Sequence, residues 1–182
     1  TSDKVQTIIT TLKSRSHNEI VVDKLQYYIK YLKKGEYYFQ DAYGEVPFYV
    51  EIDKTKGQLF GQLIKIKFLS PSQYELSVDF GQATSASVIQ YADLAVKPVN
   101  VSGGEYKKVF KINEAVDLPF LHLKLMIKPE AYEYTNQEYF VSFDDFNGTV
   151  ASYRGIDVSA DAKALSVVRL QLEGTNKHRL VE

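Results

Sequence analysis

The first apolar residues of the chain recur with the period of an α-helix. They occupy positions i, i+3, i+4 and i+7, namely Val5, Ile8, Ile9 and Leu12. This stripe predicts a first helix over residues 3–14. The polar stretch 14–18 that follows contains Ser16 and Asn18, and either side chain can cap the start of a next helix.

A second helical stripe follows this break. It predicts a helix over residues 19–34 and consists of Ile20, Val21, Leu25, Tyr28, Ile29 and Leu32. Lysines crowd the expected C-terminus, where positive charge complements the helix dipole, and Gly35 suits the position after the last turn. We therefore expect residues 1–35 to form a helical N-terminal arm of two helices.

After Gly44 the apolar residues alternate with polar ones, which is the period of a β-strand. The clearest strand candidates are 46–52, 63–69, 74–80, 106–112, 121–127 and 139–143, and 149–158 and 165–172 are expected to follow. Pro98 favours an edge strand or a connection. About eight or nine strands without a long helix between them predict a mainly β domain over residues 36–182. We expect an antiparallel β-sandwich, jelly-roll-like or C2-like.

The composition supports a β-rich chain, with 14 Tyr and 10 Phe but no Trp and no Cys. Tyrosine is enriched in strands. The lack of cysteine excludes disulfides and thiolate sites, and it is equally compatible with a cytoplasmic protein and with a bacterial or viral surface protein. No apolar run approaches the roughly 20 residues that span a bilayer, so membrane insertion is not expected. Because the chain begins at Thr1 rather than Met, we expect a processed or excised chain.

The net charge of −1 is divided unevenly along the chain. Residues 1–36 hold seven Lys or Arg against four Asp or Glu, and the remainder holds fifteen against nineteen. This balance does not favour a nucleic-acid partner.

Five tyrosines and four lysines gather in residues 24–39. Phased on the second helix, Tyr28 belongs to the core, which leaves Tyr27 and Tyr31 as the residues expected to face a protein partner.

The sequence lacks the motifs of the common catalytic and cofactor sites. It contains no G-x-G-x-x-G, no Walker pattern, no G-x-S-x-G and no H-E-x-x-H, so no cofactor is expected. Of its three histidines, only His122 lies in a strand candidate, where we expect it exposed or partly packed. Dispersed acids could still serve a glycosidase, whose two carboxylates need not be close in sequence. They are Glu51, Asp79, Glu105, Glu138 and Asp144.

One acidic segment offers oxygen ligands close together. Asp144, Asp145 and Asn147 precede Gly148, which is typical of a hairpin turn and also of a calcium-binding loop. The second acidic segment, 157–161, could approach it. The bare turn is the favoured interpretation.

These patterns favour a non-catalytic protein-interaction or structural module that acts within a larger assembly. Its partners are expected to be other protein subunits, including a second copy of the chain, with the helical arm docking on the sandwich or on a partner. The alternative is a β-sandwich of a surface or secreted protein that binds a glycan, a lipid or a ligand through calcium. A glycosidase-like enzyme that uses dispersed carboxylates is the third hypothesis.

Overall fold

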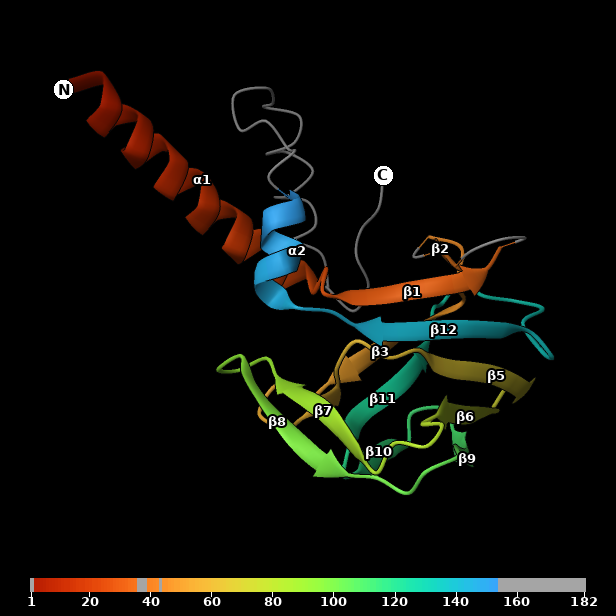
Figure 1. Cartoon of the computed structure of the whole chain (residues 1–182). Coiled ribbons are helices and arrows are strands. Elements are labelled where there is room, and N and C mark those ends of the chain that lie inside the picture. The colour runs from red at the N-terminus through yellow and green to blue at the C-terminus, as the bar shows by residue number, and fades with distance from the viewer. Residues whose placement is uncertain (1, 36–38, 43, 154–182) are drawn as a thin grey trace. The chain divides into compact units, whose positions relative to one another are not determined.

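A computed structural model describes residues 2–35, 39–42 and 44–153 (Figure 1). The chain divides into two compact units. The first consists of Thr1–Tyr28 together with Asp145–Glu182, and the second is Ile29–Asp144. This division differs from the expected boundary at residue 35. It places the residues after Tyr28 with the strands.

The first unit contains one long N-terminal helix where two were expected. Helix α1 spans Ser2–Leu25 without the predicted break. Arg15 and Glu19 form an i, i+4 ion pair of 3.0 Å across that region, so side-chain pairing supports the helix through the polar stretch. Ser16 and Asn18 therefore lie inside the helix and do not cap a second one.

Helix α1 ends nine residues earlier than predicted, through a Schellman motif. Gln26 adopts a positive φ of 52°, and the Tyr27 amide donates to the Val22 carbonyl over 3.2 Å. Strand β1, Ile29–Lys34, follows. The apolar residues of this segment fit both a helical and an alternating pattern, and the alternating one is realised. Gly35 consequently follows a strand and does not terminate a helix.

The remainder of the described first unit is helix α2, Phe146–Ser152, which packs on α1. Arg15 donates from its Nη2 to Asn147 Oδ1 over 3.1 Å. The Tyr28 and Phe146 rings lie 6.1 Å apart between centroids. The segment predicted as a strand at 149–158 thus begins as a helix. Its remainder, and the predicted strand at 165–172, lie outside the described residues.

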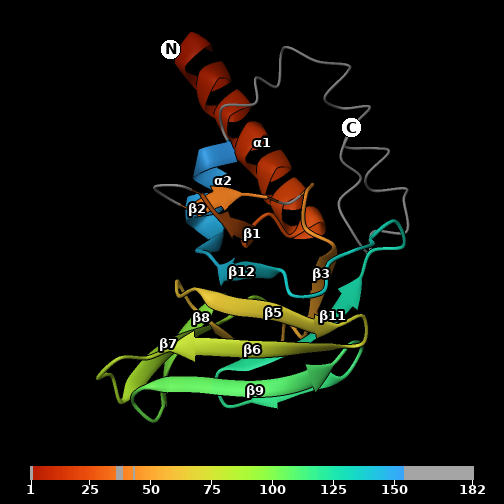
Figure 2. The ribbon, with the colours of Figure 1, turned by 90° about the vertical axis from the view of Figure 1, so that its right-hand side faces the viewer.

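The second unit holds three antiparallel sheets, which we name A, B and C. Sheet A has six strands in the order β2-β1-β12-β5-β6-β9 (Figure 2). Besides β1 they are β2 Phe39–Asp41, β12 Glu138–Phe143, β5 Ile64–Ser70, β6 Gln73–Asp79 and β9 Glu105–Lys111. Sheet B is β10 Ala115–Leu118, β11 Leu121–Ile127 and β3 Phe48–Ile52. Sheet C is β4 Gln58–Leu59, β7 Ser85–Gln90 and β8 Ala95–Asn100.

Aromatic side chains join sheet A to sheet B and form the centre of the core. Phe48 of β3 lies 5.6 Å from the Tyr31 ring of β1 and 5.6 Å from the Phe68 ring of β5. The Tyr139 ring of β12 lies 5.9 Å from the same Phe48 ring. All three contacts have the tilted or edge-to-face geometry that aromatic pairs prefer. Two sheets packed through their inner faces in this way form a sandwich.

The predicted fold class is confirmed: the chain is mainly β, with antiparallel sheets and a helical N-terminus. The strands are more numerous than expected, because short strands such as β4 and β10 carry too few residues to show a period. Pro98 lies in β8, an edge strand of sheet C, as its missing amide hydrogen requires.

Candidate functional site

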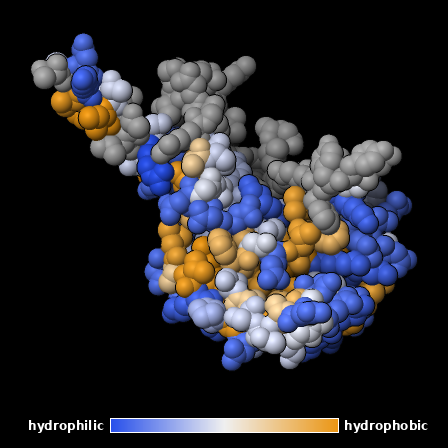
Figure 3. All heavy atoms as spheres, in the orientation of Figure 1, coloured by the Kyte–Doolittle hydropathy of each residue, from blue (hydrophilic) through white to orange (hydrophobic). Residues whose placement is uncertain are grey.

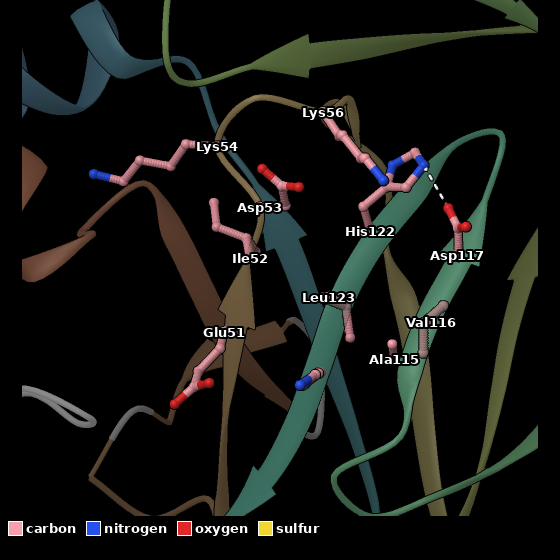
Figure 4. A pocket seen from close by; sticks show the side chains of 11 residues that line it. Glu51, Ile52, Asp53, Lys54, Lys56, Ala115, Val116, Asp117, His122 and Leu123 are labelled. Atoms are coloured by element: carbon pink, nitrogen blue, oxygen red, sulfur yellow. Dashed lines mark ion pairs between the residues drawn. The ribbon is translucent and has the colours of Figure 1, made fainter.

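A cavity of about 540 Å³ opens on sheet B and the loop between β3 and β4 (Figure 4). Charged residues of both signs surround it, and they come from three strands and one loop. They are Glu51, Asp53, Asp117, Lys54, Lys56, Lys124 and His122. The strand register brings four of these residues together. Asp117 stands opposite His122, and Lys124 stands opposite Glu51, on neighbouring strands.

His122 is held by contacts at both ring nitrogens. Its Nδ1 lies 2.9 Å from the Gly57 carbonyl oxygen, and its Nε2 lies 3.1 Å from Asp117 Oδ1. Both partners are hydrogen-bond acceptors, so a ring with protons on both nitrogens donates to each of them. The side chain is only 17% exposed, whereas that of Asp117 is 74% exposed. The histidine that the sequence marked as exposed or partly packed is thus half-buried and fixed in orientation.

The fully buried amide of Gln58 fixes the strand end that carries His122. Its Nε2 donates to the His122 carbonyl over 2.9 Å and to the Asp53 carbonyl over 3.2 Å. Its Oε1 accepts from the His122 amide over 3.0 Å. The Gln58 side chain therefore pairs with the His122 amide, shares the His122 carbonyl with the Asp53 amide, and ties β11 to the loop that forms the wall of the cavity.

Asp53 shapes the loop on the other side. Its Oδ1 accepts from the Thr55 hydroxyl over 2.6 Å and from the Thr55 amide over 2.9 Å. These two hydrogen bonds, with smaller contributions from the charges of Lys56 and His122, lower the pKa of Asp53 below its ordinary value. Asp53 is therefore an ionised group whose oxygen is already engaged by the turn.

The histidine and several of the acids that could carry chemistry are engaged by neighbouring groups. Both ring nitrogens of His122 face hydrogen-bond acceptors, the Gly57 carbonyl and the Asp117 carboxylate. Within the described residues no group of three or more His, Asp or Glu side chains could hold a metal ion. Of the dispersed acids considered for glycoside hydrolysis, Glu51 lines the cavity, whereas Glu138 pairs with Lys65 at 3.4 Å and Glu105 pairs with Lys107 at 3.6 Å.

The two tyrosines expected to face a partner occupy different environments. Tyr31 is 3% exposed, and its hydroxyl accepts from the Val50 amide over 2.9 Å. The expectation for Tyr31 was wrong because the residue belongs to β1, whose alternation turns it into the core. Tyr27 is half-buried and stacks on Tyr153 at 5.4 Å. Burial, and to a lesser degree Tyr27, raise the pKa of Tyr153 to about 12.

The acidic segment at 144–148 is not a hairpin turn, because it begins helix α2. Asp145 is the N-cap, and its Oδ2 accepts from the Gly148 amide. Asn147 lies in the helix and accepts from Arg15. Asp144 follows the last residue of β12, and its Oδ1 accepts from the Ser142 hydroxyl over 3.3 Å. The oxygens proposed as calcium ligands therefore serve local structure. The segment 157–161 lies outside the described residues.

A second candidate surface is the N-terminal half of α1. Val5 is 56% exposed and Ile8 is 59% exposed, and Ile9 is exposed as well. Figure 3 shows apolar side chains in orange on this part of the helix. The helices of the described chain are too short or too polar to cross a membrane. Val5, Ile8 and Ile9 of the predicted stripe therefore lie in the helix and are exposed to solvent.

No protein-family model matches this chain, and no curated protein matches it either.

Sequence reasoning found the apolar stripe but missed the cavity. The cavity depends on the strand register, which pairs Asp117 with His122 through a tight turn between β10 and β11. The one signal available was the pattern Asp117-x-x-x-x-His122 around a turn, because residues equidistant from a turn face one another in a hairpin. The roles of Gln58 and Gly57 in holding the ring carry no comparable signal.

Proposed function

We propose that the chain is a non-catalytic protein-interaction module within a larger assembly, and that the N-terminal half of α1 docks on another protein subunit. The observation that supports this most is the exposed stripe of Val5, Ile8 and Ile9. Contiguous apolar residues on a helix surface are typical of sites that a partner covers. The fitting partner presents an apolar helix face or groove, into which residues at i, i+3 and i+4 insert.

A second copy of this chain is the occupant to test first, since most soluble oligomers are formed by identical subunits. Light scattering should give a mass that is a multiple of 20.7 kDa for the full chain at high concentration. The double variant Val5→Asp, Ile8→Asp should return to the monomer mass with an unchanged circular dichroism spectrum. The matched control Val96→Asp changes an equally exposed valine in β8 and should keep the oligomer mass.

A full chain that remains monomeric at every concentration would exclude self-docking. In that case a photo-reactive residue placed at Ile8 tests a different subunit. The adduct must be discrete and must disappear when Val5 is changed to Asp. Adducts that persist in this variant, or that form equally from Lys97 on β8, would refute docking through α1.

A further inference from the structure

We propose that the cavity on sheet B binds an oxyanion, a carboxylate or a phosphate group, in the place that the Asp117 carboxylate occupies beside His122. The inference is independent of the docking of α1. It rests on a fixed donor, a weakly held internal anion and the lysines that line the cavity around them.

The donor is fixed because the protein holds the other side of the ring. The 2.9 Å contact of His122 Nδ1 with the Gly57 carbonyl sets the plane of the imidazole, and the Gln58 amide holds the His122 backbone on both sides. Nε2 therefore remains directed to the cavity whatever accepts from it. A donor that is oriented in advance loses little entropy when it takes a ligand.

The internal anion is held weakly. Asp117 contacts His122 at 3.1 Å, but its side chain is 74% exposed, and exposed ion pairs contribute little to stability. The Asp117 carboxylate can rotate into solvent and leave Nε2 to another carboxylate or to a phosphate oxygen. An oxyanion would accept from His122 Nε2 the same hydrogen bond that Asp117 accepts in this structure.

Lysine side chains on the wall of the cavity can assist the binding of an anion beside His122. Asp53 is engaged by Thr55. Lys56 extends from the β3–β4 loop toward the side of the cavity where His122 lies (Figure 4). Lys56 and Lys124 line the cavity, and neither makes an ion pair within the described residues. The remaining charged lining groups are Lys54 and Glu51, and Glu51 stands opposite Lys124 in the strand register.

The proton balance follows from the two hydrogen bonds. A ring that donates to Gly57 and to the oxyanion carries two protons and a positive charge. The anion therefore binds together with the protonated ring. No covalent bond forms or breaks.

Nuclear magnetic resonance of the full chain tests the proposal, with inorganic phosphate and acetate as separate probes at constant ionic strength. The ring signals of His122, assigned through His122→Asn, should shift saturably with either probe, and the tighter probe identifies the class of oxyanion. Asp117→Ala should tighten binding by about fivefold, because the competing anion is removed. Lys56→Ala should weaken it by a similar factor, while Lys97→Ala on β8 should leave it unchanged.

Three outcomes would overturn the proposal: no saturable shift with either probe, unchanged affinity in Asp117→Ala, or an equal loss in Lys97→Ala and Lys56→Ala. The substituted side chains of Asp117, Lys56 and Lys97 are solvent-accessible, and a thermal melt of each variant verifies that the sheets remain folded.

Discussion

Two buried tyrosines of sheet A differ in what their hydroxyl groups meet. The Tyr31 hydroxyl accepts from the Val50 amide and so joins β1 to β3. The Tyr74 hydroxyl is buried in β6 and has no hydrogen-bond partner within the described residues. Burial raises the pKa of Tyr74 above its ordinary value, so the group stays neutral. A buried hydroxyl without a partner costs free energy, whereas a paired one does not.

The two hydroxyls should therefore respond in opposite ways to removal. Tyr74→Phe should raise the free energy of unfolding by up to about 1 kcal/mol, because an unsatisfied polar group is lost. Tyr31→Phe should lower it by about 1–3 kcal/mol, because the Val50 amide is left unsatisfied. Urea unfolding followed by circular dichroism measures both. Equal losses in the two variants would contradict this account.

Two aspartates differ in the direction of their pKa shift. Burial raises the pKa of Asp144, although the charge of Lys30 and the hydrogen bond from Ser142 oppose the shift. The folded protein therefore favours the protonated carboxyl, and ionisation of Asp144 costs stability. That cost is absent below the ordinary pKa of aspartate and complete above the raised value. Asp53, whose pKa is lowered, has the opposite sign.

Asp144→Asn should accordingly stabilise the protein at pH 7, and the difference from the unchanged chain should shrink as the pH falls toward 3. Asp53→Asn should destabilise it slightly at pH 7, and that difference should shrink over the same range. Thermal midpoints at pH 3, 5 and 7 provide the measurement. A stabilisation by Asp144→Asn that is independent of pH would show that ionisation is not the cause.

At the scale of elements, the strands with a clear alternation were predicted well. Strand β11 occupies the predicted range 121–127, and the range predicted for β6 differs by a single residue at each end. The segment 25–34 was not predictable in the same way. Its apolar residues satisfy both periods, and only the pairing of β1 with β12, more than 100 residues away, decides between them.

The candidate site was predictable only in part, for a related reason. His122 was recognised as a strand residue, but the residues that hold it come from separate parts of the chain. Gln58 lies 64 positions earlier and Gly57 lies 65 positions earlier. Nothing in the local pattern distinguishes a buried glutamine that binds a distant backbone from an ordinary loop residue. The exposed stripe on α1, in contrast, is a local pattern and was visible.

Gln58 offers a prediction at this scale. Gln58→Leu should lower the free energy of unfolding by about 1–3 kcal/mol, because the His122 amide loses its partner, whereas the carbonyls of His122 and Asp53 keep the amides of Asp53 and Lys56 as donors. Gln90→Leu is the matched control, since Gln90 makes one exposed hydrogen bond, to the Thr55 carbonyl, and should cost less than about 1 kcal/mol. Chemical denaturation measures both. A loss in Gln58→Leu no larger than in the control would refute the inference that Gln58 stabilises the backbone of His122.

For the whole molecule, the order of strands in sheet A governs assembly. Strand β12 lies between β1 and β5, so the sheet is continuous only after Ile29 has paired with Phe143. Contacts between residues so distant in sequence require the closure of a long loop before they contribute stability.

Folding should therefore be slow for a chain of this size. We expect refolding over milliseconds to seconds, as for other β-rich proteins dominated by distant contacts. Stopped-flow tyrosine fluorescence can follow it without engineered probes, because the chain has 14 Tyr and no Trp. Far-ultraviolet circular dichroism is the independent probe, since α1 can form earlier than the sheets. Strand formation complete in microseconds would contradict the prediction.

The place of β12 also bears on synthesis by the ribosome. Strand β1 emerges early, but its partner in the centre of the sheet is made more than 100 residues later. During that interval the strand has an open edge that could pair with another nascent chain. Lys30, Lys33 and Lys34 make up half of the strand, and such charges discourage intermolecular pairing. The lysines that were expected at a helix terminus would thus oppose aggregation of β1 until β12 has been made.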